Sequence, residues 1–438
     1  MSRIQTTRSR LVAGVAALGA ASLALTGCTA GGGGGGDDST ITVMWASNEL
    51  SEEQIAAFEE ENPDLTVEFI EFDFTRLNAM ITAGDAPDVV RGNPSANLFA
   101  RGLATNLDDF VAGSEAIQED DLLPVNDAWR WDGTTRGQGN LYGIVKDWSP
   151  DTTIWQNSAL FDSAGVEPLS LTEASDWDEV LAKATELKDA GVEYPLGIEW
   201  QWGVINVVQN MVAQQGGDFF NEDFTEIDLG SPEAQRAIQW LIDFGDSGVG
   251  PTSLNPLTDG YDLPVFASGR MATTVTGYWM GGGLQGQDAA AVAETSTLAP
   301  APTYGERISP VAGGVGGWIP EGSDNKDGAW RFMEYYMAGA PAEERAATGW
   351  GLPSLQSLWD LLPADEPYQQ QAIETATAEI PYVTVLPDSP YATFEQLNEV
   401  VDRHLQQALQ GEMDAAEVGA AAEEEINTLL AQGKDQLG

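Results

Sequence analysis

Alternating apolar and polar positions open the folded part of the chain, and a helical period soon replaces them. Short extended runs with a two-residue period take turns with runs in which apolar residues recur every three or four positions. The extended runs cover 41–45, 65–69 and 88–90, and the helical runs cover 51–61 and 75–83. The order strand, helix, strand, helix, strand predicts an α/β fold with a doubly wound sheet and parallel pairing.

Local signals mark the ends of these elements. Ser51 followed by Gln54 has the sequence of a capping box, and Gly84 is placed to end the second helix. Ligands of doubly wound sheets bind at the carboxyl ends of the strands. The polar residues at these ends are therefore candidate binding residues, namely Ser47, Asn48 and Glu49 after the first strand, and Arg91 and Asn93 after the third.

The pattern changes after the first block. Residues 141–146 and 152–156 alternate as short strands, and the break over 147–151 contains an aspartate, a tryptophan and a proline. Asn157 is placed to cap a short helix that Gly165 would end. Two strands separated by a polar and aromatic break suit a chain that leaves one lobe and enters another.

A second block of alternating elements follows. Helical patterns over 176–190 and 204–214 flank an expected strand over 194–198. The junction at 199–203 reads E-W-Q-W-G, which places a carboxylate beside two tryptophans. Aromatic faces stack on the apolar faces of sugar rings, and carboxylates accept hydrogen bonds from hydroxyl groups. This junction is therefore a candidate sugar platform.

The C-terminal third contains further helices and a small-residue segment. Ser231 before Pro232 is a favoured helix start. The glycine-rich residues 310–319 predict close approach of the backbone to its neighbours. An amphipathic helix is expected over 324–338, and two helices are expected over 391–430.

The N-terminus has the pattern of an export signal. Three arginines precede an apolar run over 11–25, which suits a signal-peptide core and is too short for a stable membrane span. Leu25-Thr26-Gly27-Cys28 matches the lipoprotein signal box. That match implies that residues 1–27 are removed as a signal peptide and that Cys28 is diacylated. Residues 28–38 include six consecutive glycines and would form a flexible tether.

Length and composition restrict the function classes. A chain of 438 residues predicts two or three domains. The formal net charge of −50 argues against nucleic acid as a partner, because phosphate binding needs clustered Lys and Arg. With one cysteine, Cys28, and one histidine, His404, the chain offers neither an internal disulfide nor a usual zinc site. We expect no cofactor and no metal.

Several motifs, in this order along the chain, resemble the extracellular solute-binding proteins of sugar importers, the maltose-binding-protein-like family 1. Two departures occur: Val145-Lys146 replaces a common proline, and Met271-Ala272 reverses the usual order. The motifs are A-G-D-A-P-D-V-V at 83–90, G-N-L-Y-G-I-V at 139–145, W-D-E at 177–179, F-A-S-G-R-M-A-T-T-V-T-G-Y-W at 266–279, G-G-V-G-G-W-I at 313–319 and G-W-G-L-P at 349–353.

The resemblance implies a periplasmic-binding-protein-like fold of type II, an α/β fold with two doubly wound lobes joined by three crossovers. The first lobe would comprise 39–147 with 279–313, and the second 150–276 with 318–433. The implied function is the capture of a sugar, with an oligosaccharide favoured, and its delivery to the permease subunits of an ABC transporter. We expect a monomer without enzymatic activity, anchored through Cys28 to the outer face of the cell membrane.

Aromatic and polar residues near the implied crossovers complete the expected binding site. Tryptophans would stack on the sugar, and the carboxylates and Asn93 would bind its hydroxyls. The expected ligand-binding residues are Glu49, Asn93, Asp147, Trp148, Trp200, Trp202, Trp279, Trp318 and Trp350. Two alternatives stay open: a lipid-anchored glycoside hydrolase, which needs two opposed carboxylates, and the same fold binding a polyamine or a peptide.

Overall fold

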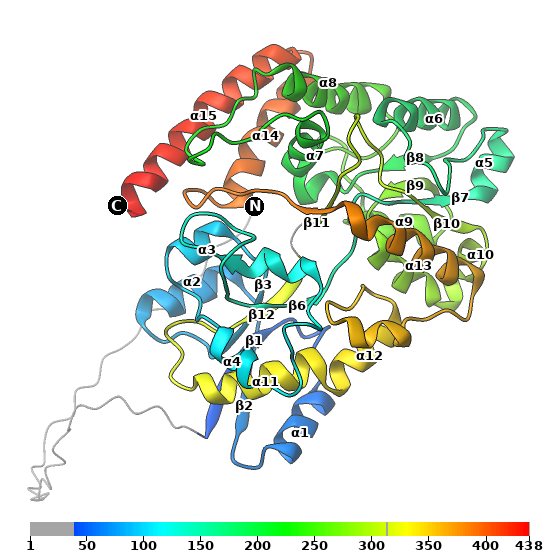
Figure 1. The fold of residues 1–438 in the computed structure, drawn as a ribbon. Coiled ribbons are helices and arrows are strands. Elements are labelled where there is room, and N and C mark those ends of the chain that lie inside the picture. Colours follow the sequence, from blue (N-terminus) through cyan, green and yellow to red (C-terminus); the bar gives the residue numbers. More distant parts are fainter. Residues whose placement is uncertain (1–38, 312–313, 438) are drawn as a thin grey trace, which may run out of the picture. The chain divides into compact units, whose positions relative to one another are not determined.

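A computed structural model describes residues 39–311 and 314–437. The side chains of Gln201, Trp202 and Val311 lie outside this description. Within the described residues two mixed sheets organise the chain, one of five strands and one of four (Figure 1). We call the five-stranded sheet, with the elements that pack on it, the first lobe. The four-stranded sheet and its elements form the second lobe.

The first sheet has the strand order β2-β1-β3-β12-β6. Strand β1 is parallel to β2 and β3, whereas β12 is antiparallel to both β3 and β6. The elements of the first lobe are β1 (Thr40–Trp45), α1 (Glu52–Glu61), β2 (Thr66–Glu71), α2 (Phe74–Ala83), β3 (Val89–Gly92), α3 (Ala96–Ala100), α4 (Asp108–Gly113), η1 (Pro124–Trp129), β4 (Arg130–Trp131), β5 (Asn140–Leu141), β6 (Ile144–Asp147), β12 (Val315–Trp318), α11 (Lys326–Ala338), α12 (Ala340–Thr348) and η4 (Gln356–Leu361).

The second sheet has the order β10-β7-β9-β8. Strands β8 and β9 are parallel, and β7 is antiparallel to both β9 and β10. The elements of the second lobe are β7 (Ile154–Asn157), α5 (Ser158–Ala164), α6 (Trp177–Asp189), β8 (Tyr194–Gly197), α7 (Trp200–Gln214), α8 (Pro232–Ser247), α9 (Asp262–Ala267), β9 (Met271–Val275), η2 (Tyr278–Gln285), η3 (Gln287–Ala289), α10 (Ala290–Ala293), β10 (Ser296–Ala299), α13 (Pro367–Glu379), α14 (Phe394–Leu409) and α15 (Ala415–Leu437).

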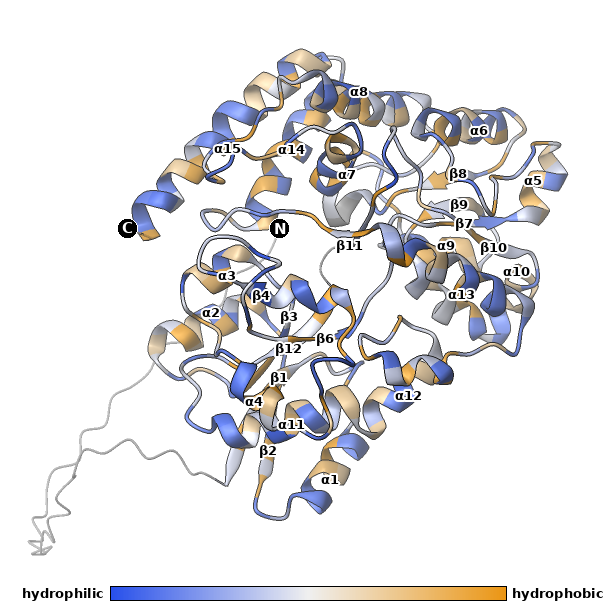
Figure 2. Cartoon of the chain, viewed as in Figure 1, coloured by the Kyte–Doolittle hydropathy of each residue, from blue (hydrophilic) through white to orange (hydrophobic). Residues whose placement is uncertain are grey.

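Helices of the second lobe enclose an apolar core. Helices α7, α8, α14 and α15 pack on one another beside the second sheet (Figure 1). Both α8 and α15 carry hydrophilic and hydrophobic residues along their length, as expected for helices with one buried face (Figure 2). Their inward residues include Ile238, Leu241, Val418 and Ile426, all of which are almost completely buried.

Three connections join the lobes, at 148–153, at 300–311 and at 349–366, and the last includes η4, which packs on α12 of the first lobe. Two of them pair with each other, because Trp148 and Leu352 exchange both of their backbone hydrogen bonds, at 2.9 and 2.8 Å. The middle connection contains β11 (Ser309–Val311), which pairs in parallel with β13 (Val383–Val385), a strand that follows η5 (Ile380–Tyr382). Paired backbone therefore links the first connection to the third, and the middle connection to β13.

The expected lobe boundaries are wrong in two places. The prediction places 279–313 in the first lobe, but β10 pairs with β7 in the second sheet. It places 318–433 in the second lobe, but α11 packs against β1, β3 and β6 of the first. The reason is that the chain adds one more strand to the second sheet before it returns, and that the glycine-rich segment is strand β12 itself.

The local signals read from the sequence are confirmed where they concern caps. Ser51 and Gln54 form both hydrogen bonds of a capping box. Asn157 caps α5, and Gly165 ends it in the left-handed conformation. One helix begins earlier than expected: α7 starts at Trp200 and has a non-helical residue at Gly203.

The expected signal peptide, lipidation site and tether fall on residues 1–38, which lie outside the described residues. Within residues 39–311 and 314–437, no helix is both long enough and apolar enough to span a bilayer.

Candidate functional site

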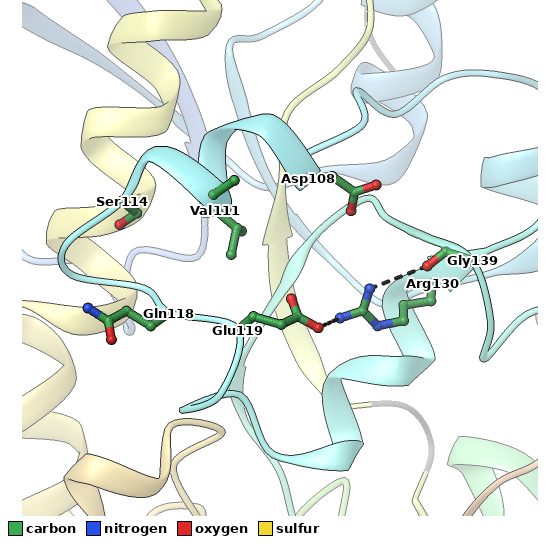
Figure 3. A pocket seen from close by; sticks show the side chains of 8 residues that line it. Asp108, Val111, Ser114, Gln118, Glu119, Arg130 and Gly139 are labelled. Atoms are coloured by element: carbon green, nitrogen blue, oxygen red, sulfur yellow. Dashed lines mark hydrogen bonds and ion pairs between the residues drawn. The ribbon is translucent and has the colours of Figure 1, made fainter.

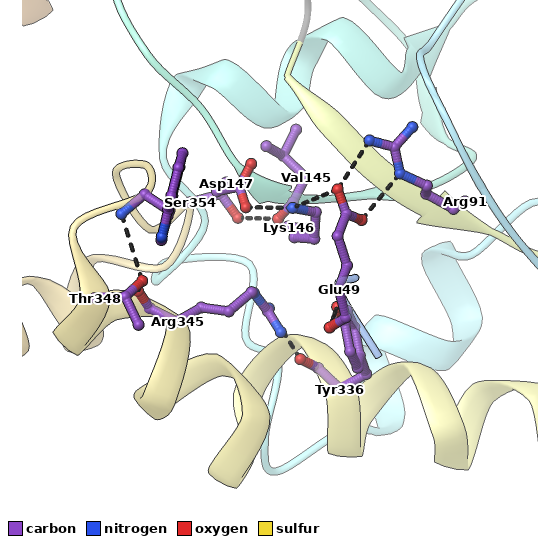
Figure 4. Close-up of polar contacts among 10 residues, drawn as sticks. Glu49, Arg91, Val145, Lys146, Asp147, Tyr336, Arg345, Thr348 and Ser354 are labelled. Atoms are coloured by element: carbon purple, nitrogen blue, oxygen red, sulfur yellow. Dashed lines mark hydrogen bonds and ion pairs between the residues drawn. The ribbon is translucent and has the colours of Figure 1, made fainter. Parts of the chain in front are cut away.

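Four charged side chains meet at the carboxyl ends of strands in the first sheet. Glu49 lies in the loop after β1, Arg91 is on β3, and Lys146 and Asp147 end β6. The Arg91 Nε and Nη2 atoms each donate to one carboxylate oxygen of Glu49, both at 2.9 Å. Lys146 Nζ lies 3.5 Å from Glu49 Oε1 and also pairs with the Asp147 carboxylate (Figure 4). We call these four residues the charged quartet.

The electrostatics of the quartet favour the ionised form of Glu49. Burial favours the neutral form of Glu49, but the hydrogen bonds from Arg91 and the charge of Lys146 outweigh it, so the pKa of Glu49 lies below its usual value. Burial likewise disfavours the charged form of Arg91, yet the bonds to Glu49 leave its pKa raised. Two negative and two positive side chains therefore compensate each other's charge.

Residues of α11 and α12 hold the loop that carries Glu49. The Tyr336 hydroxyl donates to the Glu49 backbone oxygen at 2.9 Å, and its ring meets the Trp45 ring edge-on at a centroid distance of 4.7 Å. Arg345 donates to the Tyr336 backbone oxygen at 3.0 Å and lies over the Tyr336 ring (Figure 4). The position of Glu49 is thus fixed from both its side chain and its backbone.

Two tryptophans stack where the lobes are connected. Trp279, at the start of η2 in the second lobe, faces Trp350 of the third connection with ring centroids 6.5 Å apart and planes 17° apart. Trp350 is 46% exposed, the highest value among the large hydrophobic side chains after Phe74 in the described residues. A Cβ on the next residue, Gly351, would lie 2.8 Å from the Asp147 Cβ. The aromatic pair therefore adjoins the charged quartet.

Three other expected site residues are buried, contrary to the exposure that stacking on a sugar would need. Trp148 is 4% exposed, and its indole N–H donates to the Pro353 backbone oxygen. Trp200 is 2% exposed, stacks on Phe244 and donates to Asp402. Trp318, on the interior strand β12, is 3% exposed within the core of the first lobe. All three side chains are held by packing in the protein interior.

The remaining expected residues divide into two groups. Asn93 is exposed and directly follows β3, at the sheet end where the charged quartet lies. The Trp202 side chain and Cys28 lie outside the described residues, so their roles stay predictions.

A buried acidic pair in the second lobe joins Glu199, the carboxylate of the candidate sugar platform, to Asp262, which was not selected from the sequence. Glu199 follows β8 with a φ of 46°, a strained conformation for a residue other than glycine. Its carboxylate accepts the Asp262 backbone N–H at 3.0 Å, and the Thr274 hydroxyl donates to Asp262 at 2.8 Å. Burial raises the pKa of Asp262 to about 6, although the Thr274 hydroxyl and the Glu199 N–H favour its ionised form. Only the Glu199 junction had a visible sequence signal, because Asp262 begins the short helix α9 and belongs to no motif.

A separate hollow of about 550 Å³ lies on the first lobe, between α4 and the β4–β5 hairpin (Figure 3). Arg130 crosses it and is paired with Glu119, with Asp127 at 3.1 Å and with the Gly139 backbone oxygen at 3.3 Å. No expected site residue lines it. In the part of the chain that the structure describes, no cluster of three or more His, Cys, Asp or Glu side chains is arranged to hold a metal ion.

Two doubly wound lobes, three connections between them, and charged and aromatic residues beside those connections define a periplasmic-binding-protein-like fold of type II. Comparison with known families agrees. The model of the bacterial extracellular solute-binding protein family matches residues 46–339, and the chain belongs to this family.

Part of the sequence is also similar to curated relatives, and the fold is similar to that of solved structures. A "Probable sugar-binding periplasmic protein" of Brucella suis biovar 1 is 28% identical over 170 residues, which is 37% of each chain. The match thus spans little more than a third of that relative. The Listeria monocytogenes ABC substrate-binding protein Lmo0181, in complex with cycloalternan, has a TM-score of 0.72 at 24% identity and covers 90% of this chain and 99% of its own. The GacH receptor of Streptomyces glaucescens, studied with acarbose, has a TM-score of 0.68 at 22% identity and covers 90% and 98%.

Proposed function

We propose that this protein captures a sugar outside the cell by hinge closure and delivers it to the permease subunits of an ABC importer. Its membership of the solute-binding family supports a binding role. The names of the curated relatives and the cycloalternan and acarbose complexes of the similar structures support a carbohydrate, with an oligosaccharide favoured. In this proposal the protein is not an enzyme and acts as a monomer.

The observation that carries the proposal is the exposed aromatic face beside the charged quartet. Trp350 is 46% exposed, stacks on Trp279 and is followed by Gly351, which lies against Asp147. Sugar rings combine an apolar face, which packs on an indole, with hydroxyl groups, which bond to ionised carboxylates. A neutral polyhydroxyl ligand needs both kinds of group, and the quartet supplies the carboxylates without a net charge.

The charges of the quartet disfavour a polyamine ligand and a glycoside hydrolase. A polyamine needs carboxylates without a cationic partner, but Glu49 and Asp147 are already paired with Arg91 and Lys146. A glycoside hydrolase needs a carboxylic acid that stays protonated, and therefore one with a raised pKa. The pKa of Glu49 is shifted in the opposite direction.

A thermal-shift screen tests the sugar proposal. The chain with Cys28→Ser would be melted with mono- and oligosaccharides, spermidine and short peptides. A ligand at a thousand times its Kd stabilises by roughly 4 kcal/mol, so a sugar that binds raises the Tm visibly. We expect Trp350→Ala and Trp279→Ala to abolish that shift, and Phe74→Ala, which truncates another exposed aromatic, to preserve it. A shift with spermidine or a peptide alone, or cleavage of the bound oligosaccharide within a day, would overturn the proposal.

We also propose that Cys28 carries the lipid that anchors the protein to the outer face of the cell membrane. The support is the signal box around the single cysteine. Cys28→Ser should release the protein into the medium or the soluble fraction, while its Tm shift with sugar stays unchanged. A variant that still sediments with membranes would refute the lipid anchor.

A further inference from the structure

The segment over 386–390, between β13 and α14, is bonded to both lobes, and we call it the strap. On the side of the second lobe, the Ser389 hydroxyl donates to the Phe224 backbone oxygen at 2.7 Å, and Gln209 of α7 donates to the Pro387 backbone oxygen. The residues that follow, Tyr391 and Ala392, pack into the core of the second lobe. The strap thus leads directly into α14 (Figure 1).

On the side of the first lobe, one arginine contacts the strap at two residues. Arg136 lies in the β4–β5 hairpin and is 9% exposed. Its Nε lies 2.7 Å from Asp388 Oδ1, its Nη2 donates to the Leu386 backbone oxygen at 2.6 Å, and its Nη1 donates to the Pro94 backbone oxygen at 3.3 Å. The guanidinium therefore joins the strap to the loop that follows β3.

The start of α3 reinforces this attachment. Asp388 Oδ2 accepts the Ala96 backbone N–H at 2.8 Å, and the Asn97 side chain donates to the Pro390 backbone oxygen at 2.8 Å. Both oxygens of the Asp388 carboxylate are therefore engaged by the first lobe, although its backbone belongs to a segment fastened to the second. If the lobes move apart, one of these two sets of contacts must break.

We propose that the Arg136–Asp388 pair is a latch that holds the two lobes in the arrangement seen here. An arginine that is almost completely buried loses most of its solvation, and separating it from its partner is costly unless water replaces every bond. Contacts made in only one of two arrangements shift the equilibrium toward that arrangement. The latch therefore favours the arrangement in which the strap is bonded to both lobes before a ligand arrives, and it slows separation of the lobes afterwards.

The latch has a consequence for binding that rests on the proposed function. A ligand held between closed lobes leaves only when they open, so weakening the latch speeds dissociation. Coupling of this kind typically changes the affinity for a ligand by roughly five- to a hundredfold. We expect Arg136→Gln to raise the dissociation rate and the Kd for the bound sugar roughly tenfold within that range, with a much smaller effect on the association rate.

Distance measurements between two spin labels test the latch without any ligand. Asp109→Cys on α4 and Gln239→Cys on α8 introduce exposed labelling sites, one in each lobe, in a chain with Cys28→Ser. We expect one dominant distance with the latch intact, and a second, different distance in Arg136→Gln and in Asp388→Asn. Arg331→Gln removes the Arg331–Asp64 pair, which lies within the first lobe, and should leave the distribution unchanged.

One conservative variant and one measurement protect the test against a trivial loss of folding. Arg136→Lys keeps the charge but not the forked geometry, so its second population should be smaller than that of Arg136→Gln. Circular dichroism would verify that each variant is folded. Unchanged distances in both Arg136→Gln and Asp388→Asn would overturn the latch, whatever the protein binds. A screen in which no sugar binds would refute the proposed function alone.

Discussion

At the scale of the residue, the partners of a tryptophan decide whether it serves the core or a ligand. Trp200 and Trp318 stand in motifs as suggestive as those of Trp279 and Trp350, yet the first two are enclosed by other side chains. The sequence could identify Glu49 as a candidate site residue, because its position after a parallel strand can be read from the local order of elements. It could not rank the tryptophans, because their burial depends on residues such as Phe244 and Asp402, which lie far along the chain.

The raised pKa of Asp262 predicts a pH-dependent loss of stability. The pKa is about 6 in the folded protein, against an ordinary value of 3.8 for an aspartate, so the folded protein holds this proton more tightly than the unfolded chain. The contribution of protonated Asp262 to the free energy of unfolding is fully present below about pH 4 and is lost as the pH rises to about 6. Asp262→Asn removes the buried charge and should raise the free energy of unfolding at pH 7.5 by roughly 1–3 kcal/mol.

Urea unfolding at pH 4.5 and at pH 7.5 measures this effect. The variant should exceed the natural protein in stability at pH 7.5 and approach it at pH 4.5. Asp218→Asn, at an exposed position, should change little at either pH. An Asp262→Asn variant that is less stable at pH 7.5 would show that the ionised carboxylate is needed.

At the scale of the element, the sequence predicted helices, caps and strands better than their assembly. The capping box at Ser51 and the glycine at 165 act within a few residues, so a local pattern contains all the necessary information. Strand β12 is different, because its neighbours β3 and β6 precede it by a long stretch of chain. Its glycines indicated a close approach, but nothing local identified the partner, and the lobe boundaries were misplaced for this reason.

Gly316 shows why β12 is built from small residues. A Cβ at this position would overlap the Ile144 backbone oxygen and lie 2.8 Å from the Trp129 indole nitrogen. Because backbone cannot move aside as a flexible side chain can, Gly316→Ala should lower the free energy of unfolding by at least about 2 kcal/mol. Gly113→Ala, at the end of α4, meets nothing within 4 Å and serves as the control. Equal urea midpoints for the two variants would contradict this account.

At the scale of the whole molecule, charge is the dominant property. The formal net charge is −50, from 69 acidic and 19 basic residues. Local ion pairs such as those of the charged quartet compensate only a small part of it, and the excess repels itself in the compact state. The net charge follows directly from the composition. The composition does not reveal that the positive and negative side chains of the charged quartet are equal in number and paired.

Salt should therefore stabilise the protein. The Debye length falls from about 30 Å at 0.01 M to about 8 Å at 0.15 M, which weakens repulsion across the surface. We expect the Tm to rise by several degrees when NaCl increases from 0.01 to 0.15 M. Sucrose at matched osmolarity controls for effects other than screening. A Tm that falls with salt would mean that attractive surface pairs outweigh the net repulsion.

The position of β12 between β3 and β6 also determines when the first sheet can be completed. Strands β3 and β6 are complete early in synthesis, but the strand that joins them begins only at Val315. Until then each leaves an unpaired edge, and pairing across so long a loop is slow. The N-terminal half of a newly made chain cannot finish its sheet alone. It therefore stays open during synthesis, the period in which chaperones must protect it and an export machinery can thread it.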